Sequence, residues 1–258
     1  MAPRVASLFL LLTLLACGGG DTPATSQPNP PGSPAPIGPA DVALLFYGNS
    51  HTHLNGLPLL VGGLFEQARP NQKVHLQVAA DYLFLDERLN DAPSQALLGA
   101  AGWTHVLLQA QKVSSSGTVL YSTAESQEWV RRVKARGALP VLFPEWPRRG
   151  VDEGARTYAV YESIALAEPA CVAPVPQAFD RAALALPQLA LHAPDGNHSS
   201  PAGALLAAFI LYASASGDSL QEVRPLIASP LDPAVQRQLR DVAVASLSAG
   251  PAARHRCP

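Results

Sequence analysis

Residues 42–52 read VALLFYGNSHT. The first six are apolar or aromatic on both faces of an extended chain, which is typical of a strand covered on both sides in a parallel sheet. Gly48 and the small polar residues after it predict a tight turn, because glycine tolerates backbone angles that other residues avoid. Ser50 therefore stands directly after the first strand, where a following helix would direct its free N–H groups.

The same pattern recurs along the chain, with apolar runs separated by helical periodicity. Strands are predicted at 42–47, 73–79, 104–108, 138–143 and near 170–173, and helices at 58–68, 82–100, 124–136, 153–167, 200–215 and 233–248. This alternation predicts an α/β fold, a three-layer α/β/α sandwich around a mostly parallel five-stranded sheet. Ligands of such sheets bind at the carboxyl ends of the strands, so the residues after each strand matter most.

The N-terminal residues have the pattern of an export signal. Arg4 precedes an apolar run, residues 5–15, that is shorter than the roughly 20 residues a membrane span needs. The run ends in Leu14-Leu15-Ala16-Cys17, which resembles the lipobox of bacterial lipoproteins. We expect a signal peptide over 1–16, acylation of Cys17, and a lipid-anchored location in the bacterial cell envelope. An ordinary cleaved secretory signal is the alternative.

Between this signal and the first strand lies a linker. Twelve of the 23 residues from 18 to 40 are glycine or proline, so neither helix nor sheet can propagate there. We therefore expect a flexible tether over 17–40 and one folded domain over 41–258. In an oxidising compartment Cys171 and Cys257 are expected to form a disulfide, with two unpaired thiols as the alternative.

Composition excludes some classes of partner. The hydrophobic content of 48% is enough to bury a core, so global disorder is not expected. Lys and Arg number 18 against 20 Asp and Glu, a formal net charge of −2, which provides no basic surface for nucleic acid or an anionic membrane.

A second polar motif lies beyond the last predicted strand, where the chain reads Asp195-Gly196-Asn197-His198. An Asp and a His three residues apart across a glycine turn can approach each other. The carboxylate can then fix the imidazole tautomer while the other ring nitrogen faces a nucleophile. An apolar helical pattern follows it directly.

Together these motifs resemble the SGNH (GDSL-type) hydrolases, a family with a flavodoxin-like α/β/α fold. Gly48-Asn49-Ser50 resembles the first family block. Asp195-Gly196-Asn197-His198, with Pro201 and Gly203, resembles the last. Residues 103–111, WTHVLLQAQ, are similar to a W-D-x-V-x-L-Q-x-Q stretch of one subgroup. The resemblance implies hydrolysis of an ester, often an acyl group on a carbohydrate or lipid. We expect a small-molecule or glycan ester as substrate, no metal or cofactor, and membrane contact only through the N-terminal lipid.

The same resemblance implies roles for individual residues. Ser50 would be the nucleophile, His198 the general base and acid, and Asp195 the group that orients the imidazole. The Ser50 N–H and the amide of Gln109 or Gln111 would form the oxyanion hole. The family's glycine after the second strand is missing, since the chain reads AADY over 79–82.

Other residues near these motifs are candidates for contacting substrate. Asn49 and His51 flank the nucleophile, and Trp146 follows the fourth strand, at a predicted cleft. Trp103 and Trp129 lie away from it, and we expect them in the core. Arg148 and Arg149 would either hold an anionic substrate or be solvated.

Two other functions stay open. His51 and His53 form an H-x-H pair that could bind a metal in a metal-dependent hydrolase, although such barrels usually need about 250 residues and further ligands from several strand ends. The chain could also be a non-catalytic, tethered module that holds a glycan or peptide at the strand ends.

Overall fold

The computed structural model describes residues 40–100 and 102–249. The predicted signal peptide, Cys17, Cys257 and the tether up to residue 39 lie outside this part, so the lipid anchor stays a prediction. No helix in the described part is long and apolar enough to cross a membrane.

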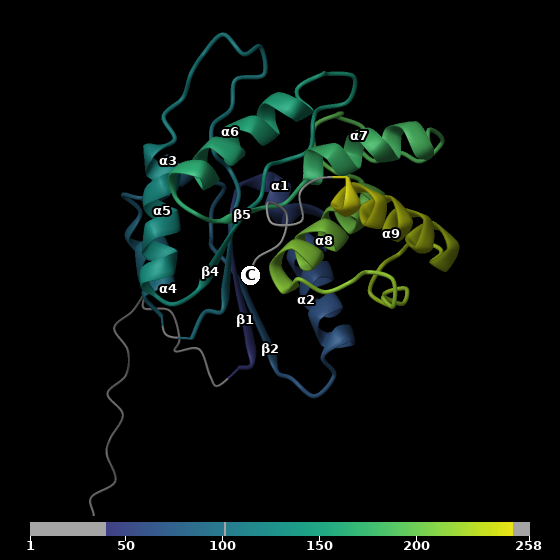
Figure 1. Ribbon diagram of the computed structural model, residues 1–258, viewed down its shortest axis with the longest axis horizontal. Coiled ribbons are helices and arrows are strands. Elements are labelled where there is room, and N and C mark those ends of the chain that lie inside the picture. Colours follow the sequence, from purple (N-terminus) through teal and green to yellow (C-terminus); the bar gives the residue numbers. More distant parts are fainter. Residues whose placement is uncertain (1–39, 101, 250–258) are drawn as a thin grey trace, which may run out of the picture. The chain divides into compact units, whose positions relative to one another are not determined.

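A single sheet of five strands forms the centre of the described residues (Figure 1). The strands are β1 (Val42–Tyr47), β2 (Val74–Val78), β3 (His105–Leu108), β4 (Leu139–Leu142) and β5 (Cys171–Val172). They are ordered β2-β1-β3-β4-β5, and each neighbouring pair is parallel. This order belongs to flavodoxin-like sheets, so the prediction of an α/β fold with a parallel five-stranded sheet is confirmed.

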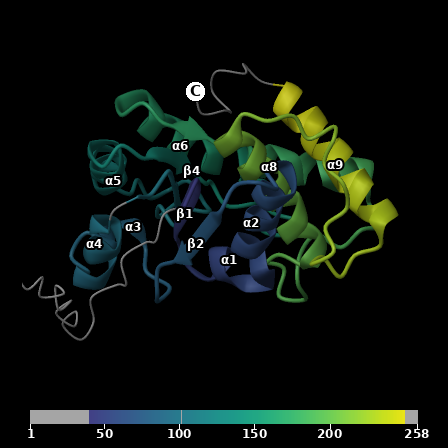
Figure 2. The ribbon, with the colours of Figure 1, turned by 90° about the horizontal axis from the view of Figure 1, so that it is seen from below.

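Helices cover both faces of the sheet, and each face has its own apolar core. One face carries α2 (Leu57–Ala68), α7 (Val175–Ala185), α8 (Pro201–Ser216) and α9 (Pro233–Ser248). The other carries α3 (Leu85–Arg88), α4 (Ala92–Gly99), α5 (Ala124–Ala135) and α6 (Gly154–Ala167). Figure 2 shows α4 and α5 on the opposite side of the sheet from α2, α8 and α9. Because the strands are parallel, their carboxyl ends all lie at one edge of the sheet, and the loops that lead into the helices begin there.

α8 is buried along nearly its whole length, because it is apolar all round and packs between the sheet and other helices. Ser200 caps its N-terminus by accepting hydrogen bonds from the Ala202 and Gly203 N–H groups. A Cβ at Gly203 would overlap the Leu191 carbonyl. Glycine therefore lets the start of α8 pack closely against the segment that precedes Asp195.

Two predicted elements differ from the structure. The predicted helix 82–100 is divided into α3 and α4, because Asp91 caps a new helix by accepting from the Ser94 N–H, with Pro93 in its first turn. The sequence predicts no helix between 167 and 200, yet α7 forms there. Prolines at 174 and 176 stand at the start of α7, where a missing N–H costs no hydrogen bond.

Cys171, the first residue of β5, is disulfide-bonded. The chain has two other cysteines, Cys17 and Cys257, and both lie outside the described residues. The pairing of Cys171 with Cys257 therefore stays a prediction.

Burial of His105 should make the fold sensitive to acid. This β3 side chain is 8% exposed and packs against the Phe65 ring, and burial lowers its pKa to about 4. The unfolded chain takes up this proton near pH 6.5, so between about pH 6.5 and 4 the unfolded state binds more protons than the folded one. The free energy of unfolding must therefore fall as the pH drops through that window.

Glutamine cannot be protonated. We therefore expect the free energy of unfolding of His105→Gln to fall by about 2 kcal/mol less than that of the wild type between about pH 7 and about pH 4.5. Urea denaturation of both proteins at the two pH values measures this difference. An equal loss of stability in the two proteins would contradict the assignment of the acid sensitivity to His105.

Candidate active site

The turn after β1 presents Ser50 at the carboxyl edge of the sheet. Ser50 begins the short helix α1 (Ser50–His53), and a 3₁₀ turn, η1 (Leu54–Gly56), follows. Asn49 caps α1 by accepting a hydrogen bond from the His51 N–H at 3.0 Å. As the first helical residue, Ser50 has an N–H without an acceptor inside the helix. Ser50 therefore offers two groups at this edge, its backbone N–H and a partly exposed hydroxyl.

Gly48 is required here by lack of space. A Cβ at this position would overlap the side-chain oxygens of Thr52 and Gln109. These two oxygens are themselves 2.9 Å apart, because the Thr52 hydroxyl donates to Gln109 Oε1. The strand therefore passes so close to the start of α1 that only glycine fits.

Asp195 and His198 lie in a small hairpin that precedes α8. Its ends form an antiparallel bridge between His192 and Ser199, and the Ala193 N–H donates to the His198 carbonyl at 2.8 Å. Gly196 forms the turn with a φ of 71°, a conformation that glycine adopts without strain. Asp195 and His198 thus face each other across this turn.

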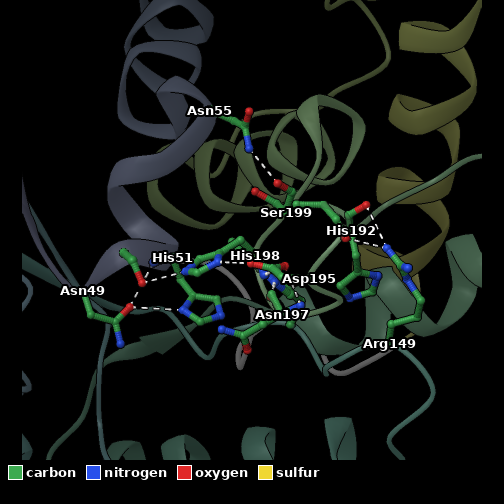
Figure 3. Close-up of polar contacts among 12 residues, drawn as sticks. Asn49, His51, Asn55, Arg149, His192, Asp195, Asn197, His198 and Ser199 are labelled. Atoms are coloured by element: carbon green, nitrogen blue, oxygen red, sulfur yellow. Dashed lines mark hydrogen bonds and ion pairs between the residues drawn. The ribbon is translucent and has the colours of Figure 1, made fainter.

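The hairpin places His198 against the turn that carries Asn49 and His51 (Figure 3). His198 Nε2 lies 2.9 Å from Ser50 Oγ, and His198 Nδ1 lies 2.6 Å from Asp195 Oδ2. The other Asp195 oxygen accepts from the N–H groups of Asn197 and His198 at 2.9 and 3.0 Å. The predicted serine, histidine and aspartate are therefore brought into one hydrogen-bonded line.

Electrostatics fix the charge of the aspartate in this line. The hydrogen bond from His198, followed by the two backbone N–H bonds, lowers the pKa of Asp195 to about 2. Asp195 is therefore a carboxylate near neutral pH. A carboxylate at His198 Nδ1 keeps the proton on that nitrogen, which leaves Nε2 as the acceptor for the Ser50 hydroxyl.

His51 lies beside the imidazole of His198, with the two ring centres 5.2 Å apart. Burial, and then the neighbouring His198, lower the pKa of His51 to about 4. Its Nδ1 lies 3.2 Å from Asn49 Oδ1, so this nitrogen carries the proton. His51 is therefore neutral near pH 7 and adds no positive charge that would oppose protonation of His198.

Trp146 is a buried support of the hairpin, which corrects its predicted role as a substrate contact. The side chain is only 2% exposed. It stacks on Phe179 at 5.2 Å, and its indole N–H donates to the Asn197 carbonyl at 2.8 Å. Trp146 thus fixes the hairpin and leaves no face for a ligand.

The two arginines after Trp146 are also engaged within the protein. Arg149 donates through its backbone N–H to the Gly196 carbonyl at 2.8 Å and through its guanidinium to the His192 and Ala193 carbonyls, as Figure 3 shows for the guanidinium. Arg148 forms an ion pair with Glu153 at 3.1 Å. Arg149 therefore holds the hairpin from the side opposite to Ser50.

Gln109 holds the turn from Gly48 to Thr52 in place, which corrects its predicted role in the oxyanion hole. The residue has no exposed surface. Its Oε1 accepts from the Asn49 N–H and the Thr52 hydroxyl, each at 2.9 Å, while its Nε2 donates to Glu145 at 2.7 Å. A side chain that is fully buried and bonded at both ends cannot reach an ester oxygen.

Gln111 is corrected in the same way. Its Nε2 donates to the carbonyls of Lys112 and Ser122, both at 2.9 Å, and its Oε1 accepts from the Ser126 hydroxyl at 2.6 Å. Both amide hydrogens are therefore used to close the loop after β3. Of the predicted oxyanion donors, only the Ser50 N–H stays available.

Two residues that the sequence did not single out lie next to these groups. Glu145 is the partner of Gln109, and burial raises its pKa to about 7. Arg88, at the end of α3, has no exposed surface and donates to backbone carbonyls after β1 and β2. Sequence offers no signal for Arg88, because an arginine within Asp-Glu-Arg suggests a solvated helix face.

The position where the family glycine was expected has a glycine-like backbone. After β2 the chain passes through Asp81, whose φ is 64°. Few residues other than glycine adopt this left-handed conformation. The local backbone shape is therefore kept although the glycine is absent.

The two histidines of the H-x-H pair point to different neighbours. The His51 ring contacts Trp146 and His198, whereas the His53 ring contacts Tyr82 at 4.9 Å. Within residues 40–100 and 102–249, no three His, Cys, Asp or Glu side chains are grouped closely enough to hold a metal ion.

Comparison with known proteins gives matches among solved structures. No family model and no curated protein matches this sequence. A protein from Slackia heliotrinireducens, provisionally described as an SGNH hydrolase, aligns at 28% identity over 66% of this chain and 97% of its own, with a TM-score of 0.55. A DUF4886 family protein from Bacteroides uniformis aligns at 14% identity over 81% of this chain and 95% of its own, with a TM-score of 0.63. The chain has the α/β fold of the SGNH hydrolases.

Proposed function

We propose that this chain is a serine-dependent ester hydrolase in which Ser50, His198 and Asp195 carry the reaction. The observation that supports it most is the continuous line of hydrogen bonds from Asp195 through His198 to Ser50, at 2.6 and 2.9 Å. The fold shared with SGNH hydrolases supports a hydrolase in general. The triad itself and the choice of an ester are our proposal.

In this mechanism His198 moves the proton and Ser50 forms the covalent bond. Ser50 Oγ attacks the ester carbonyl carbon while His198 Nε2 accepts the hydroxyl proton. The tetrahedral intermediate collapses, and the alcohol leaves with the proton that His198 returns. Water then attacks the acyl-serine with His198 again as the base, which releases the carboxylic acid and restores Ser50. Asp195 stays ionised and stabilises the imidazolium in both halves.

Stabilisation of the oxyanion falls to backbone donors in this proposal. The Ser50 N–H, at the start of α1 and next to the hydroxyl that attacks, has no acceptor among the described residues. Asn49 stays a predicted substrate contact. Its Oδ1 is bonded to His51, and its amide nitrogen has no hydrogen-bond partner among the described residues. His51 lies beside the site through the contact of its ring with that of His198.

The natural substrate is proposed by class. The family resemblance implies an acyl ester of a carbohydrate or a lipid. The predicted Cys17 anchor and tether would hold the site at the surface of a membrane in the cell envelope, where such acylated polymers and lipids occur.

A covalent label tests this function. We expect a p-nitrophenyl phosphonate ester to modify Ser50 in the presence of excess chelator, because phosphorus accepts the serine oxygen as an ester carbonyl does. Mass spectrometry of the peptide that contains Ser50 would detect the adduct, and Ser50→Ala, as the control, should stay unlabelled. Turnover of an ester that a chelator abolishes, without a label on Ser50, would favour the metal alternative. Neither label nor turnover would favour a binding module.

A further inference from the structure

A buried arginine connects the two loops that flank the nucleophile. Arg88 Nη2 donates to the Gly48 carbonyl at 2.8 Å, in the turn after β1, and to the Asp81 carbonyl at 2.7 Å, in the loop after β2. Its Nη1 donates to the Ala80 carbonyl at 3.1 Å and to the Ser94 hydroxyl at 2.9 Å. One side chain therefore ties the Ser50 turn to the neighbouring strand end.

The charge of Arg88 has no acidic partner within ion-pair distance in the described part of the chain. Its guanidinium lies over the Tyr47 ring at 5.5 Å, and the residue has no exposed surface. Burying an unpaired charge is unfavourable unless its hydrogen bonds are satisfied. The three carbonyls at the strand ends and the Ser94 hydroxyl accept from the two Nη atoms, while Nε finds no partner among the described residues.

Hydrogen bonds to these carbonyls also orient the N–H groups on the same peptides. All peptide bonds in the described residues are trans, and a trans peptide directs its C=O and N–H to opposite sides. The Asn49 N–H, opposite the Gly48 carbonyl, is taken by Gln109. The N–H groups of Asp81 and Tyr82, opposite the other two carbonyls, find no acceptor among the residues described.

We propose that Arg88 is a positioning residue for Ser50: by holding the Gly48 carbonyl and the loop after β2 together, it fixes the turn that presents the Ser50 hydroxyl and N–H. This inference rests on the proposed serine esterase. The left-handed backbone at Asp81 is unfavourable for a residue with a side chain, and such a conformation persists only when its surroundings hold it.

Kinetics of Arg88 variants test the proposal. We expect Arg88→Met to lower kcat on a small activated ester by about 100-fold, because a displaced donor loses its effect in the transition state. KM should change by less than about twofold, since the ground-state carbonyl does not use the donor. Arg88→Lys keeps the charge but not the fork that bonds both loops, and should lose about tenfold in kcat. Inhibition by a boronic acid, which forms a tetrahedral anionic adduct, should weaken by the same factors.

A matched control separates positioning from general destabilisation. Val133→Ala removes a fully buried side chain from α5, on the same face of the sheet as α3, and should lower stability while leaving kcat unchanged. If Arg88→Met does not fold, the folded Arg88→Lys variant carries the test. An unchanged kcat in Arg88→Lys, or a loss confined to KM, would overturn the role of Arg88. Equal rates for the wild type and Ser50→Ala would overturn the proposed function, and this role with it.

Discussion

Ser50→Ala, His198→Ala and the double variant should each hydrolyse a small activated ester more slowly than the wild type by a similar factor, on the order of 10⁴ or more. The reason is that the hydroxyl is a weak nucleophile without its base, and the base has no proton to take without the hydroxyl. The 2.9 Å contact between Ser50 Oγ and His198 Nε2 makes these two groups one chemical unit. Their losses should therefore not add.

Asp195→Ala is the informative comparison. Asp195 orients the imidazole without exchanging atoms, and 48% of its side chain is exposed, so water can partly replace it. We expect a smaller loss in kcat than for Ser50→Ala or His198→Ala. Initial rates of the four variants on one ester, with circular dichroism to check folding, measure the series. Losses for Ser50 and His198 that multiply in the double variant would argue against a shared mechanism.

Gly48→Ala should lower both stability and activity, although it alters no polar group. The added Cβ would overlap the side-chain oxygens of Thr52 and Gln109, so either β1 or the start of α1 must move. Overpacking of this kind costs about 1–3 kcal/mol of stability. A shift of about 1 Å in Ser50 should lower kcat by about 100-fold.

Gly63→Ala provides a matched control for this variant. Gly63 lies in α2, where a Cβ would meet only Leu226 at 3.7 Å, an ordinary van der Waals contact. Alanine there should raise stability by about 0.5–1 kcal/mol through helix propensity and leave kcat unchanged. Urea denaturation and initial rates compare the two. If Gly48→Ala had the stability and the rate of the wild type, the turn would accommodate a Cβ, and the requirement for glycine at position 48 would be wrong.

The parts of the fold that the sequence predicts are those set by local pattern. The β1 run is apolar on both faces because the strand is covered on both sides, and this leaves a direct trace in the residues. The D-x-x-H spacing across Gly196 is similarly local, since three residues and a turn determine which groups face each other. The parallel order of the strands follows from their alternation with helices.

The roles of the two glutamines could not be predicted, because an amide has two donors and two acceptor sites and its partners come from distant segments. Gln109 is used by the Asn49 N–H and Glu145, and Gln111 by the loop that ends at Ser122. Arg88 was missed for the same reason, since nothing near it in sequence reveals that three carbonyls from other loops surround its guanidinium. Side-chain identity limits what a residue can do, but tertiary neighbours select which of these possibilities is realised.

The separation of the two reacting residues along the chain has a consequence for the newly made protein. Ser50 and His198 lie 148 positions apart, and the hairpin that carries His198 is fixed only when α8 and the loop after β4 are in place. While the polypeptide is being synthesised, the nucleophile exists long before its base. Under the proposed mechanism, a nascent chain that has not yet reached His198 is therefore latent, because its serine has no base to accept the hydroxyl proton.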